Sequence, residues 1–288
     1  MQITYERDLK TGAQSLAAFV RREPVLYGQL LGILTRLSAD IETFGRSRPH
    51  LWLVKDEHGA LLGGALRTPP HPVQFTLMPR EILHRLGAQI IRDDEECPGL
   101  IGVSPEVESL AQSMAPSLDS LECRLEMTLY ELTKLQVPAS GSLQMRKAGT
   151  EHTELVAAWL QRFTIDCNLP NASMGRQRLN EEIRSGRVDL GFDPSGEPVF
   201  MVMTTIINEA QAARLGGVYT PDGCRGKGHA TEGIAKVVEG LLHRGIQHIG
   251  LFTDKRNPLS NRLYRNLGFE ERRDVKMMMW RDMNQAET

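Results

Sequence analysis

The stretch from Gly217 to Ala230 constrains the fold more than any other part of this 288-residue chain. Val218 to Thr220 have the character of a strand end, Pro221-Asp222-Gly223 has the composition of a turn, and Arg225-Gly-Lys-Gly-His-Ala230 follows. Apolar residues then recur at helical spacing, at Ile234, Val237, Val238 and Leu241. A strand, a glycine loop and a helix N-terminus together predict an anion site, because unpaired N–H groups and the helix dipole both attract negative charge.

The glycines of this loop favour close contact with a phosphate group. Gly226 and Gly228 would let the backbone approach the phosphate without a Cβ in the way. The loop is neither a P-loop nor a Rossmann fingerprint, because it contains neither G-x-x-x-x-G-K-[ST] nor G-x-G-x-x-G. Its pattern is instead Arg225-x-x-Gly228-x-Ala230.

A second pattern lies downstream, Asn257-x-x-Ser260-x-x-x-Tyr264-x-x-x-Gly268-Phe269. Asn257 is suited to cap a helix that begins at Pro258, and Gly268 is suited to end it. Ser260 and Tyr264 lie four residues apart on this helix, so both can face one ligand. In their order and spacing the two patterns resemble the signatures of the GNAT superfamily of acyl-CoA N-acyltransferases, over roughly residues 143–281.

The resemblance implies acetyl-CoA as acyl donor, with no metal, and a bulge in the strand before the loop, where Gly216-Gly217 stands. It implies that Tyr264 is the general acid that protonates the departing thiolate. The residues that it implies for cofactor binding are Val218, Tyr219, Thr220, Arg225, Gly226, Lys227, Gly228, His229, Ala230, Thr231, Asn257 and Ser260.

The general base is left open by the sequence. Many members of the family place a glutamate early on the strand before the loop, but residues 212–219 contain no carboxylate. Glu209, Asp166 or a chain of waters are the alternatives, or an acceptor that is only weakly basic. Deprotonating an ordinary primary amine, with a pKa of about 10.4, costs roughly 4–5 kcal/mol at neutral pH.

The expected secondary structure follows the same order in both halves of the chain: helices, hairpin, strand, helix, strand, helix, strand. With the resemblance, this predicts an α/β (α+β) fold of two tandem GNAT-like domains, each a mixed, mostly antiparallel sheet flanked by helices. We expect a degenerate domain at 1–138 and the catalytic domain at 139–288. The first has Met78-Pro79 where a glycine loop would stand, so we expect it not to bind coenzyme A.

The composition of the chain argues against some classes of binding partner and indicates a cellular compartment. A net charge of −2 and a pI near 6.5 argue against nucleic acid and acidic lipid, and no apolar run is long enough to span a membrane. The four cysteines are scattered without metal-ligand spacing, so we expect reduced thiols and a cytoplasmic protein.

These expectations combine into an N-acetyltransferase that acts on a primary amine of a small molecule or peptide, with a homodimer left open. The alternative is a non-catalytic acyl-CoA-binding sensor or scaffold. Tandem GNAT-like proteins also include mycothiol synthases and aminoacyl-tRNA-dependent transferases. The weakly acidic charge disfavours a tRNA partner, and nothing in the sequence identifies a thiol-sugar acceptor.

Overall fold

The structure is a computed structural model that describes residues 1–41, 48–115, 120–137, 140–167, 169 and 174–281. The chain forms two compact units, the first made of residues 1–128 with 273–288 and the second of residues 129–272. In the described parts, no helix is both long enough and apolar enough to cross a membrane.

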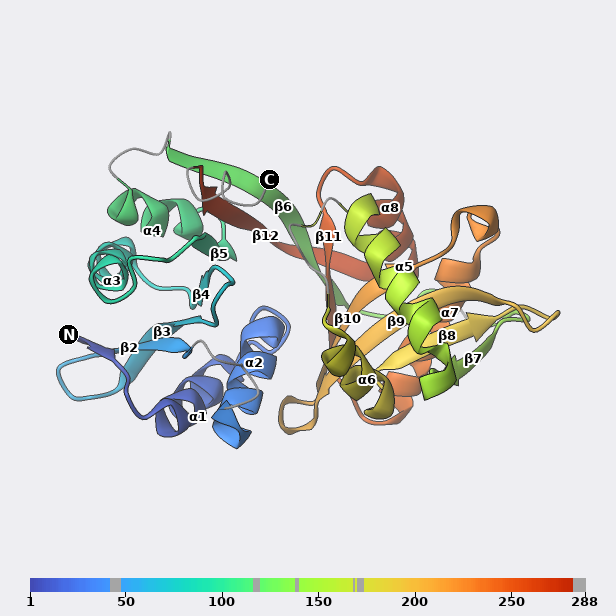
Figure 1. Ribbon diagram of the computed structural model, residues 1–288, viewed down its shortest axis with the longest axis horizontal. Coiled ribbons are helices and arrows are strands. Elements are labelled where there is room, and N and C mark those ends of the chain that lie inside the picture. The colour runs from blue at the N-terminus through green and yellow to red at the C-terminus, as the bar shows by residue number, and fades with distance from the viewer. Residues whose placement is uncertain (42–47, 116–119, 138–139, 168, 170–173, 282–288) are drawn as a thin grey trace. The chain divides into compact units, whose positions relative to one another are not determined.

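The first unit has a sheet with two helices on each face (Figure 1). Its own strands are β1 (Gln2–Tyr5), β2 (His50–Lys55), β3 (Leu61–Arg67), β4 (Val73–Phe75) and β5 (Gly99–Val103). Neighbouring strands are antiparallel from β1 to β4, and β4 and β5 are parallel. One face carries α1 (Leu9–Val20) and α2 (Gly28–Ala39), and the other carries α3 (Arg80–Asp93) and α4 (Glu106–Met114).

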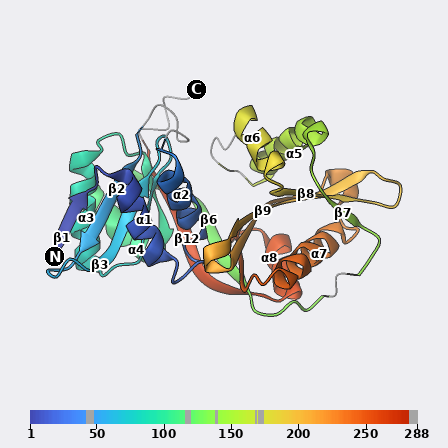
Figure 2. The same cartoon turned by 90° about the horizontal axis from the view of Figure 1, so that it is seen from below.

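The second unit repeats this plan. Its own strands are β7 (Gln144–Lys147), β8 (Val188–Phe192), β9 (Pro198–Ile207), β10 (Ala212–Tyr219) and β11 (His248–Asp254). Strands β7 to β10 are successively antiparallel, and β10 is parallel to β11. Figure 2 shows α5 (Thr153–Asp166) and α6 (Arg176–Arg184) on one face, with α7 (His229–His243) and α8 (Pro258–Leu267) on the other. The predicted mostly antiparallel sheets flanked by helices are confirmed.

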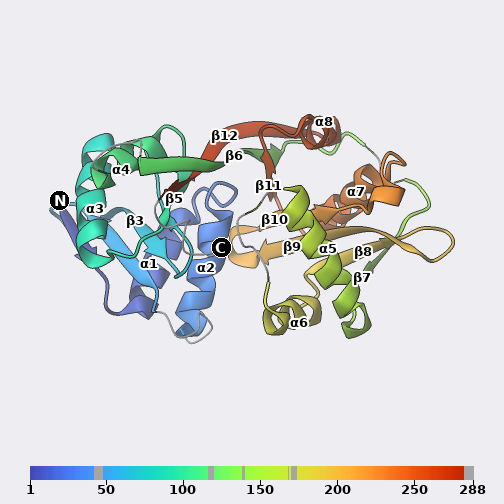
Figure 3. The ribbon, with the colours of Figure 1, turned by 45° about the horizontal axis from the view of Figure 1, so that its top comes forward.

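Two long strands contribute residues to both units. They are β6 (Leu121–Leu132) and β12 (Phe269–Trp280), which are hydrogen-bonded neighbours (Figure 3). Phe269 is buried in the core of the second unit, whereas Met278 is buried in the core of the first. The compact units therefore do not divide at the predicted boundary after residue 138, because the C-terminal strand returns to complete the first sheet. Pro138 and Ala139 at that boundary lie outside the described residues, and the assignment of domains to 1–138 and 139–288 stays a prediction.

The core of the second unit has a layer on each face of its sheet. Leu215 of β10 packs with Ile234 of α7 and Leu267 of α8. On the opposite face, Tyr219 of β10 packs with Trp159 of α5, their ring centroids 5.8 Å apart. The predicted site lies at the C-terminal end of β10, next to these two core layers.

Candidate functional site

The end of β10 carries the predicted bulge. Gly216 pairs with Met203 of β9, but the next pair joins Tyr219 to Met201, so β10 has one extra residue. Gly217 occupies it with a φ of +56°, in the left-handed region that favours glycine. Residues four apart on a regular strand share a face, yet Leu215 and Tyr219 lie in opposite core layers. Beyond the bulge, the side chains of β10 therefore point to the opposite face of the sheet from the one that regular alternation would give.

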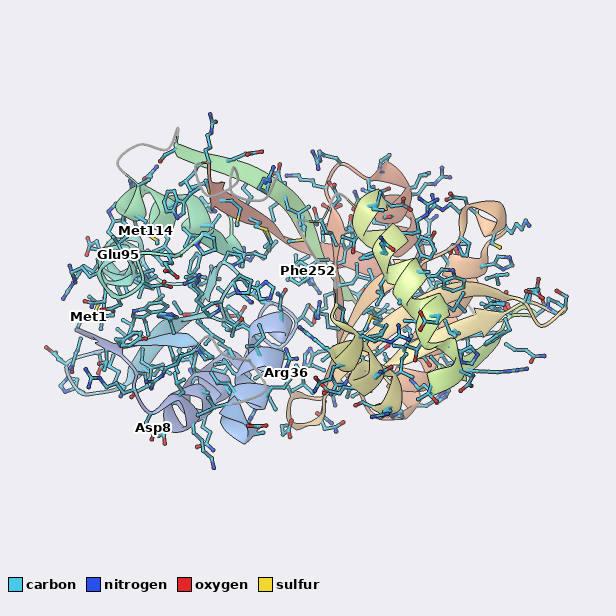
Figure 4. All side chains as sticks on the ribbon, viewed as in Figure 1. Met1, Asp8, Arg36, Glu95, Met114 and Phe252 are labelled. Carbon is cyan, nitrogen blue, oxygen red and sulfur yellow. The ribbon has the colours of Figure 1, made fainter. Side chains whose placement is uncertain are left out.

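The bulge coincides with the point where β10 loses its other neighbour. Pairing with β11 runs from Ala212 to Leu215, whose partner is Leu251. Phe252, labelled in Figure 4, is the first residue of β11 beyond that register. The β11-facing edge of β10 past Leu215 thus has no strand partner in the described parts of the chain. An unpaired strand edge presents backbone N–H and C=O groups that an extended ligand can bind.

The glycine loop follows a short 3-10 turn, Asp222–Cys224, and leads into α7. Gly226 and Gly228 have φ values of +76° and +84°, and no atom lies within 4 Å of the place where a Cβ would stand on either. Gly228 is the N-cap of α7 and offers no side-chain cap. The backbone N–H groups of residues 226–231 have no acceptor among the described residues, so they form a run of free donors at the positive end of the helix dipole.

The predicted cofactor residues of the loop and of its two flanks differ in their exposure to solvent. Lys227 is exposed, and His229, Ala230 and Thr231 are half-buried in the first turn of α7. Thr220 has a hydroxyl that is shielded from solvent and has no hydrogen-bond partner in the described structure. Such an orphaned hydroxyl beside open glycines and free N–H groups fits a bound polar ligand, and acetyl-CoA suits this donor set.

Tyr219 and Arg225 are used within the protein itself. Tyr219 is buried under α5 with Trp159, which leaves only its backbone for a ligand. Arg225 donates from Nε to the carbonyl oxygen of Thr220 over 2.9 Å and from Nη2 to Asp166 Oδ2 over 2.5 Å. Its Nη1 lies 3.0 Å from a carboxylate oxygen of Asp222. Arg225 therefore braces the loop, and the hydrogen bond to Asp166 raises the pKa of its guanidinium.

Helix α8 has the predicted ends. Asn257 Oδ1 accepts a hydrogen bond from the backbone N–H of Ser260 over 3.1 Å, and Pro258 occupies the first position. Gly268 closes the helix with a φ of +96°. Ser260 is half-buried, whereas Tyr264, one turn further on, is only 6% exposed. The local signals in the sequence were sufficient to predict this helix.

Tyr264 lies in an apolar environment. Its ring packs against Tyr130 and Phe269, at centroid distances of 6.2 and 5.9 Å. Its hydroxyl forms no hydrogen bond within the described chain. Burial raises the pKa of the phenol above its ordinary value of 10.0, and nearby Cys167 adds to the shift. The phenol therefore stays protonated at neutral pH, as a proton donor requires.

Cys167, at the end of α5, is a neighbour of this site that the sequence analysis did not assign to it. Burial, reinforced by Asp166 and Asp254, raises the pKa of its thiol to about 11. Cys167 is thus a neutral thiol at neutral pH and a poor nucleophile. No sequence pattern connects it to Tyr264; the fold brings the two residues together.

The two candidate bases differ sharply in position. Glu209 lies in a short 3-10 turn, Asn208–Ala210, ahead of β10, and the first residue of β10, Ala212, is already roughly 17 Å of strand away from the bulge at Gly217. Asp166 is close to the loop but forms an ion pair with Arg225. The structure therefore excludes Glu209 as a base acting at the bulge and leaves Asp166 engaged.

Arg214 is a further residue that the sequence analysis did not single out. It lies on the α5/α6 face of β10, and its Nη1 is 3.8 Å from where a Cβ on Gly216 would stand. Its Nε is shielded from solvent without a hydrogen-bond partner in the described chain. Burial lowers the pKa of the guanidinium, partly offset by Glu182.

The strand, bulge, glycine loop and buried tyrosine together are the arrangement expected of an acyl-CoA-dependent acyltransferase. Residues 158–269 match the family model described as the acetyltransferase (GNAT) family. The chain therefore contains a GNAT acetyltransferase domain, which confirms the predicted enzyme class.

Solved structures extend the likeness to both units. A GNAT-family acetyltransferase from Colwellia psychrerythraea is 15% identical with a TM-score of 0.59, covering 97% of this chain and 100% of its own. A GCN5-related N-acetyltransferase from Sphaerobacter thermophilus is 16% identical with a TM-score of 0.62, covering 96% and 94%. A tandem GNAT protein from the clavulanic acid biosynthesis pathway is 12% identical with a TM-score of 0.57, covering 96% and 97%. The predicted tandem GNAT-like fold is confirmed. No curated protein matches the chain.

Proposed function

We propose that the second unit transfers an acetyl group directly from acetyl-CoA to a primary amine of a small molecule or peptide. The observation that carries the proposal is the run of unpartnered N–H groups from Gly226 to Thr231, at two open glycines with positive φ. Backbone donors in this arrangement are suited to a pyrophosphate.

Bound acetyl-CoA would supply the acetyl group as an activated thioester. In the proposal the loop holds the pyrophosphate through backbone N–H groups, with Lys227 and His229 beside it. The unpaired edge of β10 at Val218 and Thr220 binds the extended pantetheine arm by its backbone. Asn257 and Ser260, at the start of α8, contact the same arm. Arg225 acts by bracing the loop, since its guanidinium is held by Asp166 and Asp222.

Tyr264 gives the proton of its Oη to the sulfur that departs from the acetyl group. A phenol, with an ordinary pKa near 10, is a weaker acid than a thiol near 8.5, and burial raises the pKa of Tyr264 further; the transfer is therefore uphill and depends on good hydrogen-bond geometry. The Tyr264 hydroxyl forms no hydrogen bond in the described structure, so no internal bond has to break before it donates its proton, which supports this role. The incoming amine must lose its proton to water or to a group other than Glu209, or be a weak base from the start.

We infer that the first unit does not bind the cofactor. The helix that corresponds to α7 is α3, which begins after Met78 and Pro79 and has no glycine there. Just before it, the Leu77 N–H already donates to Tyr27 Oη over 2.9 Å. A cytoplasmic location is part of the proposal, supported by four cysteines that are all free thiols.

Calorimetric titration of acetyl-CoA tests the proposal. We expect one site per chain, abolished in Gly228→Val, because a β-branched side chain is strained at positive φ and covers the donors. Gly196→Val is the matched control: Gly196 has a φ of +86° and equally open surroundings, but it lies in the β8–β9 turn. Two sites would show that the first unit also binds. No binding at millimolar acetyl-CoA would end the proposal.

Thiol release from acetyl-CoA over a panel of amines tests the chemistry. Tight cofactor binding without release for any amine would favour the alternative, a non-catalytic acyl-CoA-binding sensor. Release with particular amines would identify the acceptor class.

A further inference from the structure

A pocket of about 590 Å³ lies in the second unit on the α7 face of its sheet. Its walls come from β7, β8, β9 and the second half of α7. The volume is within the range of small-molecule sites. None of the predicted cofactor or catalytic residues lines it.

The lining carries more positive than negative charge. Its cations are Lys147, Arg187, Lys236 and Arg244, and its one carboxylate is Asp189. Three of the cations have acidic partners: Lys147 is 2.9 Å from Asp189, Arg187 is 3.0 Å from Glu182, and Lys236 is 2.8 Å from Glu232. Arg244 is exposed and forms no ion pair within the described chain. Its charge acts on Asp189, which already pairs with Lys147, so the lining keeps one positive charge in excess.

The wall holds two buried polar groups, and one of them, Thr204, lacks a partner and points to a ligand. Thr204 is 4% exposed, and its Oγ1 has no hydrogen-bond partner among the described residues. A buried hydroxyl without a partner is destabilising, and a bound molecule that supplied one would recover that loss. Asp189 is 8% exposed, and burial raises the pKa of its carboxyl despite the hydrogen bond from Lys147.

Part of the remaining wall is apolar, although Ser185 and Asn208 also line the pocket. Met145, Ile206, Val237 and Leu241 supply the apolar part, next to the polar groups. A ligand that satisfied both parts would carry a negative group for Arg244, a polar atom for Thr204 and a compact apolar body.

We infer that this pocket is a second ligand site, separate from the glycine loop, for a small organic anion with an apolar portion. Arg244 pairs with the carboxylate or phosphate of that anion, and Thr204 Oγ1 hydrogen-bonds to it. The inference does not depend on the acetyl transfer proposed above.

Calorimetric titration of the full chain with benzoate and with phenyl phosphate tests the inference, with neutral benzamide as the matched compound. We expect binding of at least one anion and none of benzamide. Thr204→Val, which keeps the side-chain shape, and Arg244→Gln should each weaken binding about tenfold. Arg85→Gln, which changes an exposed arginine of α3, should leave it unchanged.

Binding of an anion to the wild-type chain does not by itself locate the anion in this pocket, because the glycine loop also attracts anions. Loss of binding in Gly228→Val together with retention in both pocket variants would place the anion at the loop and overturn the inference. So would equal binding of benzamide, or no binding of either anion at millimolar concentration. Thermal unfolding of each variant establishes that it is folded.

Discussion

Arg225 Nη2 donates a hydrogen bond to Asp166 Oδ2 over 2.5 Å, which ties the glycine loop to the C-terminal end of α5. The two residues are 59 positions apart in the sequence. Through this contact the conformation of the loop depends on a helix from the other face of the sheet.

The pair should contribute modestly to stability. Its side chains are 50% and 41% exposed, so solvent screens their attraction. A double-mutant cycle with Arg225→Gln and Asp166→Asn should give a coupling energy of about 0.5 kcal/mol in denaturant unfolding, and the coupling should shrink with added salt. Zero coupling at low salt would mean that Asp166 does not hold Arg225 in solution.

Tyr264→Phe should lower kcat roughly 100-fold with little change in the Kd for acetyl-CoA. Because burial raises the pKa of Tyr264, the phenol stays protonated as the pH rises, and wild-type kcat should not fall on its account below about pH 10. Steady-state rates across pH give both results. Tyr130→Phe is the control, since Tyr130 Oη donates to Glu271 over 2.8 Å. It should lower stability by about 1 kcal/mol and leave kcat unchanged; an undiminished kcat in Tyr264→Phe would remove the assigned role.

Arg214→Met should raise the free energy of unfolding, by up to about 1 kcal/mol, because Nε is buried without a partner. Arg187→Met is the contrasting variant. Arg187 pairs with Glu182, which is 7% exposed, and its loss removes the ion pair of this buried carboxylate, leaving only the charge of Arg214 nearby. That variant should lose about 1–3 kcal/mol. Urea unfolding of the two variants measures both changes. A destabilised Arg214→Met would show that the guanidinium of Arg214 stabilises the fold.

The Glu108–Lys276 ion pair should make stability depend on pH in the acid range. Lys276 Nζ lies 2.7 Å from Glu108 Oε1. Burial acts to raise the pKa of Glu108, but hydrogen bonds from Lys276 and Ser104 outweigh it, and the pKa lies below its ordinary 4.5. A depressed folded-state pKa contributes stability that is present above the unfolded value and lost as the pH falls through the folded one.

Wild type should therefore exceed Glu108→Gln in unfolding free energy by about 1 kcal/mol at neutral pH. The difference should close as the pH falls below 4.5, the ordinary value for this carboxyl. Chemical unfolding at a series of pH values measures it. A difference that stayed constant down to pH 3 would be incompatible with the ion pair as its source.

A chain that ends at Arg272 should lose the folded first unit. Residues 275–279 of β12 pair with β5, and Val275 and Met278 are buried. Without them an edge of β5 is unpaired and its core face is uncovered. Hydrogen exchange of the backbone amides at Gly99–Val103 should become fast. A chain that lacks only residues 282–288, and so keeps β12 whole, is the control. Unchanged protection of β5 would show that the first unit folds without β12.

The local features of the site could be predicted from residues that are neighbours in the sequence. Gly217, Gly226 and Gly228 have the positive φ values expected of a bulge and a phosphate loop, and Asn257 and Gly268 bound α8 as predicted. These features depend on backbone sterics and on hydrogen bonds within a few residues, so they can be inferred from neighbouring residues alone.

Which side chains stabilise the fold and which remain free depends on contacts between distant parts of the chain. Arg225 matches the loop pattern but is held by Asp166, Tyr264 acquires Cys167 as a neighbour, and Arg214 Nε is left without a hydrogen-bond partner in the described chain. The division into units was equally hidden, because β12 follows the second core in sequence yet completes the first sheet. Such contacts join residues that are distant along the chain, and their energies depend on burial and geometry that no local pattern contains.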